Sequence, residues 1–257
     1  MDLKTINDIN SKTWDRWATD RGDYSSPISH ETFLKAQQGY WDVTIAADRP
    51  VPKDWFPELK DAKVLGLASG GGQQCPIFVA LGANVTVLDN SEKQLQLEKE
   101  VADRENYNIN LIKGDMTDLS VFEDETFDLV FNPVSTPYIR DVIPVWKEVY
   151  RVLKKGGIFL TGLNNPMSFI FANSANQRDL IVKSKLPFDP VSDLTEEELN
   201  DLINNNHALF FSHSLETLLG GQMKAGFRLL DLIEDYDKYD ELSQYTPIYF
   251  ATKAIKE

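Results

Sequence analysis

The chain has 257 residues, of which 42% are hydrophobic and 26% are charged, and its formal net charge is −14 at pH 7. This length allows one large domain or one domain with a cap, and the hydrophobic content suits a globule with a buried core. Forty acidic residues stand against 26 basic ones, and no basic patch is present. The charge argues against a surface for duplex nucleic acid, because such binding rests mainly on phosphate contacts.

Cysteine usage and the first residues of the chain narrow the class further. Cys75 is the only cysteine, so we expect neither a disulfide framework nor a cysteine-based zinc site, and no metal. No apolar run reaches the roughly 18 residues of a membrane helix, and residues 1–17 lack the basic-then-apolar order of a signal peptide. We therefore expect a cytoplasmic protein without a membrane partner.

Residues 1–60 differ from the hundred residues that follow and are rich in aromatic side chains. Ser29 is placed to cap a helix over residues 30–38, and three prolines between residues 50 and 57 indicate an extended connector. The pattern predicts a helical cap whose rings are mainly core. Rings of this cap can also line a pocket for a substrate, and the candidates are Tyr24, Tyr40 and Trp41.

From Lys63 onward, short apolar strands alternate with helical segments. The strands are expected at residues 63–67, 84–88, 110–113, 127–131 and 158–162. Helices are expected to start near Gln73 and to span residues 91–105 and 138–153. This alternation predicts a parallel sheet with helices on both faces.

Residues 164–212 interrupt the alternation and predict an insertion beside the site, with a short helix that Thr195 and Glu198 cap. A helix over residues 215–223 and a closing pair of strands at 227–233 and 248–255 follow. The chain thus divides into a cap (residues 1–60) and an α/β domain (residues 61–257) that contains the insertion.

The stretch KVLGLASGGGQQ, residues 63–74, is where we expect a ligand. Its strand runs through Ser69–Gly72 toward the start of a helix, where free backbone N–H groups and the helix dipole favour anionic or hydrogen-bond-accepting groups. Glycines also let a ligand approach the main chain closely.

Other polar residues stand at the ends of successive strands. Asp89 ends the second strand, Asp115 and Met116 follow the third, and Asn132 and Pro133 follow the fourth. In open parallel sheets, ligands bind outside the carboxyl ends of the strands. There, Asp89 can accept both hydroxyls of a ribose, and Asp115 can accept from an adenine amino group while Met116 packs on the ring.

These motifs resemble those of the class I S-adenosylmethionine-dependent methyltransferases. The matching stretches are VLGLASGGG (64–72), VTVLDNS (85–91), GDM (114–116), FDLVFNPVS (127–135) and YRVLKKGGIFLTG (150–162). The last stretch is typical of the bacterial small-molecule branch, the quinone-methyltransferase-like group. The resemblance implies an α/β, Rossmann-like fold with a seven-stranded, mostly parallel sheet in the order 3-2-1-4-5-7-6, in which strand 7 is antiparallel.

The resemblance also implies S-adenosyl-L-methionine as cofactor and S-adenosyl-L-homocysteine as product. The cofactor-binding residues that it implies are Ala68, Ser69, Gly70, Gly72, Gln73, Asp89, Asn90, Gln94, Asp115, Met116, Asn132 and Pro133.

Two positions of the first motif depart from the family pattern. Gly66 stands where the family carries an acidic residue, and Ala68 stands where it carries its first glycine. A cap residue or a backbone carbonyl would then have to hold the amino group of the cofactor. Asn132-Pro133 continues without the aromatic residue of the Asn-Pro-Pro-Tyr signature, so we infer no DNA or amide substrate.

We expect in-line transfer of a methyl group to a small molecule, which requires alignment of the nucleophile and exclusion of water. A general base is needed only where the nucleophile arrives protonated; His30 is the candidate base, and Tyr138 is a candidate to face the transfer site.

Two alternatives remain open. One is a sensor or interaction module that binds S-adenosylmethionine without catalysis. The other is an NAD-dependent oxidoreductase, whose fingerprint would need glycine or alanine at Cys75.

Overall fold

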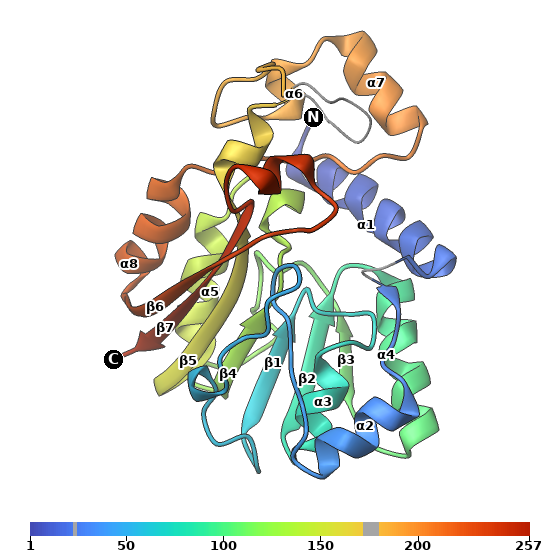
Figure 1. Ribbon diagram of the computed structural model, residues 1–257, viewed down its shortest axis with the longest axis vertical. Helices are drawn as coiled ribbons and strands as arrows, with labels where there is room; N and C mark the ends of the chain where they lie inside the picture. Colours follow the sequence, from blue (N-terminus) through green and yellow to red (C-terminus); the bar gives the residue numbers. More distant parts are fainter. Residues whose placement is uncertain (23–24, 172–179) are drawn as a thin grey trace.

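A seven-stranded sheet with helices on both faces forms the centre of the computed structural model, which describes residues 1–22, 25–171 and 180–257 (Figure 1). Its strands are β1 (Lys63–Leu67), β2 (Asn84–Asp89), β3 (Asn110–Lys113), β4 (Phe127–Asn132), β5 (Leu153–Asn164), β6 (Phe227–Asp235) and β7 (Tyr249–Lys256). They are arranged in the order β3-β2-β1-β4-β5-β7-β6. β7 runs antiparallel to β5 and β6, and the other neighbours are parallel. The predicted fold class, strand order and antiparallel strand are confirmed.

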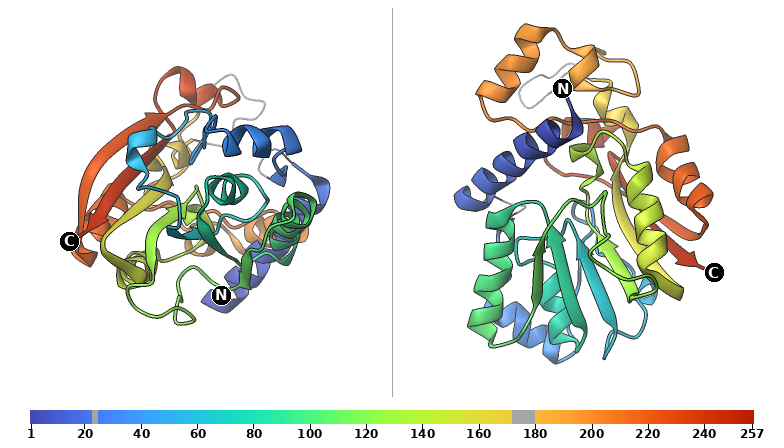
Figure 2. Two further views of the ribbon diagram at one scale, coloured as in Figure 1. Left: turned by 90° about the horizontal axis from the view of Figure 1, so that it is seen from below. Right: turned by 180° about the vertical axis from the view of Figure 1, so that it is seen from behind.

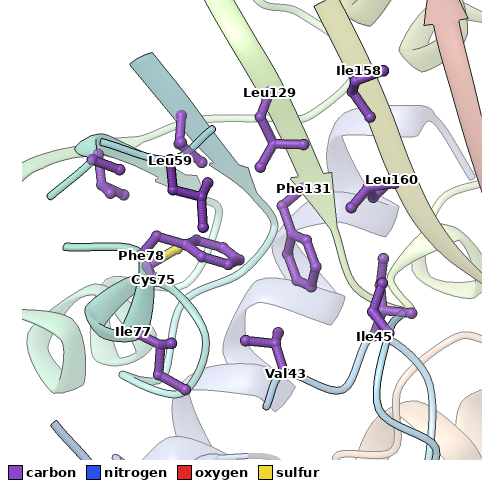
Figure 3. Packing of buried hydrophobic residues seen from close by; sticks show 14 of the residues in the cluster. Val43, Ile45, Leu59, Cys75, Ile77, Phe78, Leu129, Phe131, Ile158 and Leu160 are labelled. Atoms are coloured by element: carbon purple, nitrogen blue, oxygen red, sulfur yellow. The ribbon is translucent and has the colours of Figure 1, made fainter. Parts of the chain in front are cut away.

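The two faces of the sheet bury two separate apolar layers, because successive side chains of a strand point to opposite faces. In β4, Leu129 and Phe131 pack toward α3 (Cys75–Ala80), as Figure 3 shows, whereas Val130 belongs to the layer under α5 (Ile143–Val152). Helix α4 (Glu92–Glu105) lies on the first face and α8 (Gly221–Ala225) on the second. The layers fix the sheet, and with it the strand ends that carry the site.

Helix α5 begins later than the sequence pattern predicts. The expected start was Tyr138, but this residue lies in a short 3₁₀ turn, Thr136–Tyr138, and the helix starts at Ile143. Pro144 explains the difference, because proline is tolerated in the first turn of a helix and not in its interior. Tyr138 is thereby left in the connection that follows β4.

The N-terminal residues do not form one helical unit. Helix α1 (Leu3–Asp20) packs against α4 and crosses the sheet at the carboxyl ends of its strands, as Figure 2 shows from behind. Helix α2 (His30–Gln37), which Ser29 caps as predicted, packs instead against α3 and α4 and lies low in Figure 1. The division at residue 60 remains a proposal.

The insertion lies against α1 above the carboxyl ends of the strands (Figure 1). It contains α6 (Pro190–Asp193) and α7 (Glu196–Asn204), and α7 starts with the predicted capping box of Thr195 and Glu198. The Asn10 side chain of α1 accepts from the backbone N–H of Leu209 (2.7 Å) and donates to its carbonyl (3.1 Å). These bonds join α1 to the end of the insertion.

Among the helices of the described residues, none is long and apolar enough to cross a membrane.

Candidate active site

A cavity of about 630 Å³ lies at the carboxyl ends of β1 to β4. This volume is in the range of about 300–1,000 Å³ that is usual for ligand pockets. Its wall includes the strand ends, α1 through Trp14, the connector at residues 42–48, and the β6–β7 connection at residues 237–239. The segment at residues 26–32 and Ile77 of α3 also contribute to it. The sheet, the N-terminal helix and the connector therefore enclose one space.

Most of the predicted cofactor residues line this cavity. They are Ala68, Gly70, Gln73, Asp89, Asn90, Gln94, Asp115, Met116 and Pro133. Ser69, Gly72 and Asn132 are buried behind the lining. The structure brings the lining residues together because the parallel strands end at the same edge of the sheet.

The segment Ser69–Gly72 after β1, called the glycine loop below, differs from expectation in the direction of its N–H groups. Gly70 donates to Asp89 Oδ2 (2.9 Å), Gly71 to the Gln94 carbonyl (3.0 Å) and Gly72 to Glu98 Oε1 (2.8 Å). The expectation that these three groups are free for a ligand is wrong. Buried N–H groups must be paired, and the left-handed backbone of Gly72 (φ 73°) turns the loop toward α4.

Asp89 is a buried carboxylate at the centre of this arrangement. It accepts from Gly70 through Oδ2 and from the backbone of Ser91 through Oδ1 (2.9 Å). Burial raises the pKa of Asp89 to about 6, although the two N–H donors oppose the rise. The group is therefore ionised at neutral pH and able to accept from hydroxyls in the cavity.

Gln94 presents an unsatisfied acceptor. Its Nε2 donates to Ser25 Oγ (2.6 Å), and its buried Oε1 has no hydrogen-bond partner within the described parts of the chain. An unpaired buried acceptor is costly, and Gln94 lines the cavity. A donor group of a bound ligand would remove this cost.

Helix α1 supplies contacts that sequence reasoning missed. Asn7 donates to the Asp115 carboxylate, and Ser11 donates to the Asn90 carbonyl (2.7 Å). Asp15 accepts from the Ser91 hydroxyl (2.7 Å). These bonds join α1 to the ends of β2 and β3, and they place α1 over the part of the cavity near Asp115.

An aromatic group bounds the cavity on the same side. Trp14 lines it and packs edge-on against Tyr138, with ring centroids 5.0 Å apart, and against Trp17 at 4.9 Å. Tyr138 also lines the cavity and contacts Phe210 of the insertion (5.1 Å). Tyr138 thus lines the cavity, and its place at the transfer site stays a prediction. Trp14 was missed because nothing in its local sequence distinguishes it from a core tryptophan.

The remaining sequence candidates lie elsewhere. His30 Nδ1 is 2.7 Å from Glu105 Oε2, and its side chain is 62% exposed. Tyr40 and Trp41 line a second depression of about 420 Å³. Tyr24 lies outside the described residues. Thr32 of α2 lines the cavity, whereas the exposed ring of His30 turns to Glu105 and is not among the lining residues.

No histidine lines the cavity among the residues that the structure describes. His213 is buried with Nε2 at 3.0 Å from the Thr136 carbonyl, and burial lowers its pKa. Its neutral ring therefore donates to the turn before Tyr138. In residues 1–22, 25–171 and 180–257, no three His, Cys, Asp or Glu side chains group as metal ligands would.

The altered first motif has a packing reason. A Cβ at Gly66 would lie 2.3 Å from Cys75 Sγ, so the space of the family's acidic side chain is filled by this thiol. Burial, together with Glu98, raises the pKa of Cys75 well above its ordinary value. Cys75 is therefore a small packing residue here.

Gly66→Ala is expected to lower the free energy of unfolding by about 1–3 kcal/mol, because the added methyl group overpacks the site. Urea denaturation measures this loss. Cys75→Ala removes the clashing sulfur, so the double variant should lose less than the sum of the two single losses. Strict additivity would show that the two residues do not compete for one space.

Comparisons with known proteins agree with this architecture. Residues 65–161 match the family described as a methyltransferase domain. The "Uncharacterized methyltransferase YbaJ" of Bacillus subtilis is 44% identical over 248 residues, which cover 96% of this chain and 97% of that protein. A sterol 24-C-methyltransferase of Aspergillus fumigatus is 36% identical over 148 residues, which cover 56% of this chain and 34% of that protein.

Among solved structures, an S-adenosylmethionine dependent methyltransferase from Mesorhizobium loti superimposes with a TM-score of 0.59 at 20% identity, covering 79% of this chain and 95% of that one. This likeness concerns the fold. These comparisons do not favour the two alternatives, a non-catalytic sensor that binds S-adenosylmethionine and an NAD-dependent oxidoreductase. The cavity fits the cofactor, since Asp89 and Gln94 both line it, and the buried Oε1 of Gln94 has no hydrogen-bond partner among the described residues. Its position at the strand ends, the sheet order and the close relative over nearly the full length together show that this chain belongs to the class I S-adenosylmethionine-dependent methyltransferases.

Proposed function

We propose that this methyltransferase transfers the methyl group to a small molecule bound in the same cavity, by in-line displacement. One observation carries the proposal: the cavity extends without interruption from Asp89 and Asp115 to a second wall at residues 42–48 and 237–239. One part can hold the cofactor while the other holds an acceptor. When bound, the cofactor supplies an electrophilic methyl group on a sulfonium.

The cofactor is proposed to follow the strand ends. Asp89 would accept from the ribose hydroxyls, and Asp115 would accept from the adenine amino group beside Met116. The methionine end would lie along Ala68 and Gly70. The support is the common lining of one cavity by these residues, the ionised state of Asp89 at neutral pH and the low exposure of Met116 (6%).

The acceptor is proposed to bind against the connector at residues 42–48. Ile45 accepts from the Val134 N–H (3.1 Å), and the buried Asp235 carboxylate accepts from the N–H groups of Ala47 (2.9 Å) and Arg49 (3.1 Å). The connector is therefore tied to the ends of β4 and β6. A wall held in this way can align an acceptor, which is the main requirement of the reaction.

The charge of this wall supports a neutral or cationic acceptor. Asp42, Asp48 and Asp237 line it, and among the described lining residues Lys238 is the one cation, 3.2 Å from Asp48. A polyanion would meet repulsion there, so nucleic acid is not proposed as a partner. The cytoplasmic location stays a prediction.

A nucleophile that arrives unprotonated is proposed, because His30 lies outside the cavity and no other histidine lines it in the described chain. Tyr138 is proposed to orient the acceptor next to Trp14. The chain's part in the reaction is then to bind, align and exclude water.

Thr44→Trp tests the proposed acceptor wall. Val43 and Ile45 are buried in the core, and Thr44 between them lines the cavity, so a larger side chain there should occupy the acceptor part. We expect S-adenosylmethionine to raise the Tm of the variant and of the unchanged enzyme by the same amount. Transfer of labelled methyl groups to a panel of neutral and cationic metabolites should fall about 100-fold.

The matched control is Thr19→Trp, an exposed position on α1 outside the cavity lining, which should retain both properties. Undiminished transfer by Thr44→Trp, or label found on nucleic acid instead of small molecules, would contradict the proposal.

A further inference from the structure

The glycine loop is supported from behind by a carboxyl group that the first motif does not contain. Glu98 of α4 is fully buried (0% exposed), and its Oε1 accepts from the Gly72 N–H at 2.8 Å. The position that usually carries an acidic residue, Gly66, has no room for a side chain, because Cys75 fills the space. The carboxylate that contacts the glycine loop therefore comes from Glu98 of α4 and not from the first motif.

Helix α4 lies close to the loop at this point. A Cβ on Gly72 would lie 3.1 Å from the Leu97 carbonyl and 2.9 Å from Val101 Cγ2. The neighbouring Gly71 N–H donates to the Gln94 carbonyl (3.0 Å). The first half of α4 thus holds two successive loop amides, one by its backbone and one by the Glu98 side chain.

We propose that Glu98 is the positioning residue that fixes the glycine loop for the methionine end of the cofactor, in place of the acidic residue missing at Gly66. The assignment rests on the proposed placement of the cofactor along Ala68 and Gly70. It gives Glu98 two tasks: its Oε1 holds the Gly72 amide, and its charge acts on the cofactor through the loop.

The effect of the Glu98 charge on the cofactor depends on the absence of a neighbouring group that compensates this charge. Oε2 of Glu98 has no hydrogen-bond partner among the residues described, and the same holds for the buried hydroxyl of Tyr107. The titratable groups that face Glu98 are Asp89 from β2, Cys75 from α3 and Tyr107 after α4. None of them is a cation, so nothing in this set stabilises an ionised Glu98.

Burial raises the pKa of Glu98 to about 8, and Asp89 adds to the rise while the Gly72 N–H opposes it. Near neutral pH the group is therefore mostly protonated. A positive charge bound across the loop favours the ionised form, because charges interact strongly in a buried site. S-adenosylmethionine carries a sulfonium charge and S-adenosylhomocysteine does not, so Glu98 should favour the substrate form over the product form as it ionises.

The test compares the dissociation constants of S-adenosylmethionine and S-adenosylhomocysteine between pH 6 and pH 9. For the unchanged enzyme, we expect the preference for S-adenosylmethionine to rise about 3- to 10-fold relative to Glu98→Gln over this range. Dividing by the variant cancels the titration of the ligands themselves. The glutamine keeps an acceptor for Gly72, so both ligands should still bind.

Glu100→Gln is the matched control. Glu100 lies on the same helix, its side chain is 54% exposed, and it pairs with Arg21 at the surface. This variant should follow the unchanged enzyme at every pH. If Glu98→Gln does not fold, Glu98→Met preserves the size of the side chain, removes the charge, and should weaken both ligands about 10-fold through the unpaired Gly72 N–H.

Two negative results are distinguishable. An enzyme that binds neither ligand would overturn the proposed function. Normal binding with the same pH profile in Glu98→Gln, or in Glu98→Met where that variant is the one that folds, would overturn only the role of Glu98.

Discussion

Asp89→Ala is expected to weaken binding of S-adenosylmethionine by about 5- to 150-fold, the loss that corresponds to about 1–3 kcal/mol from charged hydrogen bonds. The carboxylate is 9% exposed, lines the cavity and is already oriented by the N–H groups of Gly70 and Ser91. A side chain held in this way needs little reordering when it accepts from ribose hydroxyls. Its removal takes away these bonds and also frees the Gly70 amide.

Calorimetric titration with S-adenosylmethionine measures this effect, with Asp103→Ala as control because Asp103 lies exposed on α4. Affinity should also fall for the unchanged enzyme as the pH drops through about 6, the pKa of Asp89, since the protonated group loses its charge. Asp89→Ala should lose that part of the pH dependence. Equal affinity in the two proteins at pH 7.5 would remove Asp89 from the ribose site.

The pKa of Asp89 also affects folding. Because its folded pKa lies above its ordinary value of 3.8, its contribution to stability is full below pH 3.8 and is lost as the pH rises through about 6. Burial of this charge therefore costs stability at the pH where we expect it to serve binding.

Trp146→Ala is expected to lower the free energy of unfolding by about 3–5 kcal/mol, through loss of buried contact and the cavity left behind. The indole is 0% exposed, its ring lies 5.7 Å from that of Phe159, and its Nε1 donates to the Thr217 carbonyl (3.1 Å). The backbone of Gly221 approaches so closely that a Cβ there would lie 2.8 Å from the ring. Little collapse can fill such a space.

Urea denaturation measures the effect, and Trp14→Ala is the matched comparison. Trp146 belongs to α5 and lies in the apolar layer between this helix and the sheet, whereas Trp14 lines the cavity. The Trp146 variant should bind S-adenosylmethionine normally below its unfolding transition, and the Trp14 variant should be nearly as stable as the unchanged enzyme but bind the cofactor more weakly. The opposite pattern would mean that the two tryptophans have been assigned the wrong roles.

The strands and their polar ends were predictable because their information is local. Apolar runs such as residues 84–88 and 127–131 end in polar residues, and parallel strands bring those ends to one edge. Asp89, Asp115 and Pro133 could therefore be grouped from the sequence, and all three line the cavity. The family resemblance supplied the strand order, which the structure confirms.

The rest of the site depends on tertiary packing that no local pattern records. Asn7 reaches Asp115 across 108 positions of sequence, and Ser11 reaches Asn90 across 79. The direction of α2 decides that His30 meets Glu105 and does not face the cavity. In the same way, the contact between Glu98 and the glycine loop follows from how α4 lies on β2, although the position of Glu98 nine residues after Asp89 was visible in the sequence.

The central claim is that the cavity at the strand ends holds the cofactor, with its ribose at Asp89. A crystal structure of the enzyme with S-adenosylhomocysteine tests this claim most directly. We predict both ribose hydroxyls within hydrogen-bond distance of the Asp89 carboxylate, the adenine beside Asp115 and Met116, and an open space next to the sulfur that reaches Thr44. Ligand density elsewhere on the chain, or a ribose turned away from Asp89, would contradict the account.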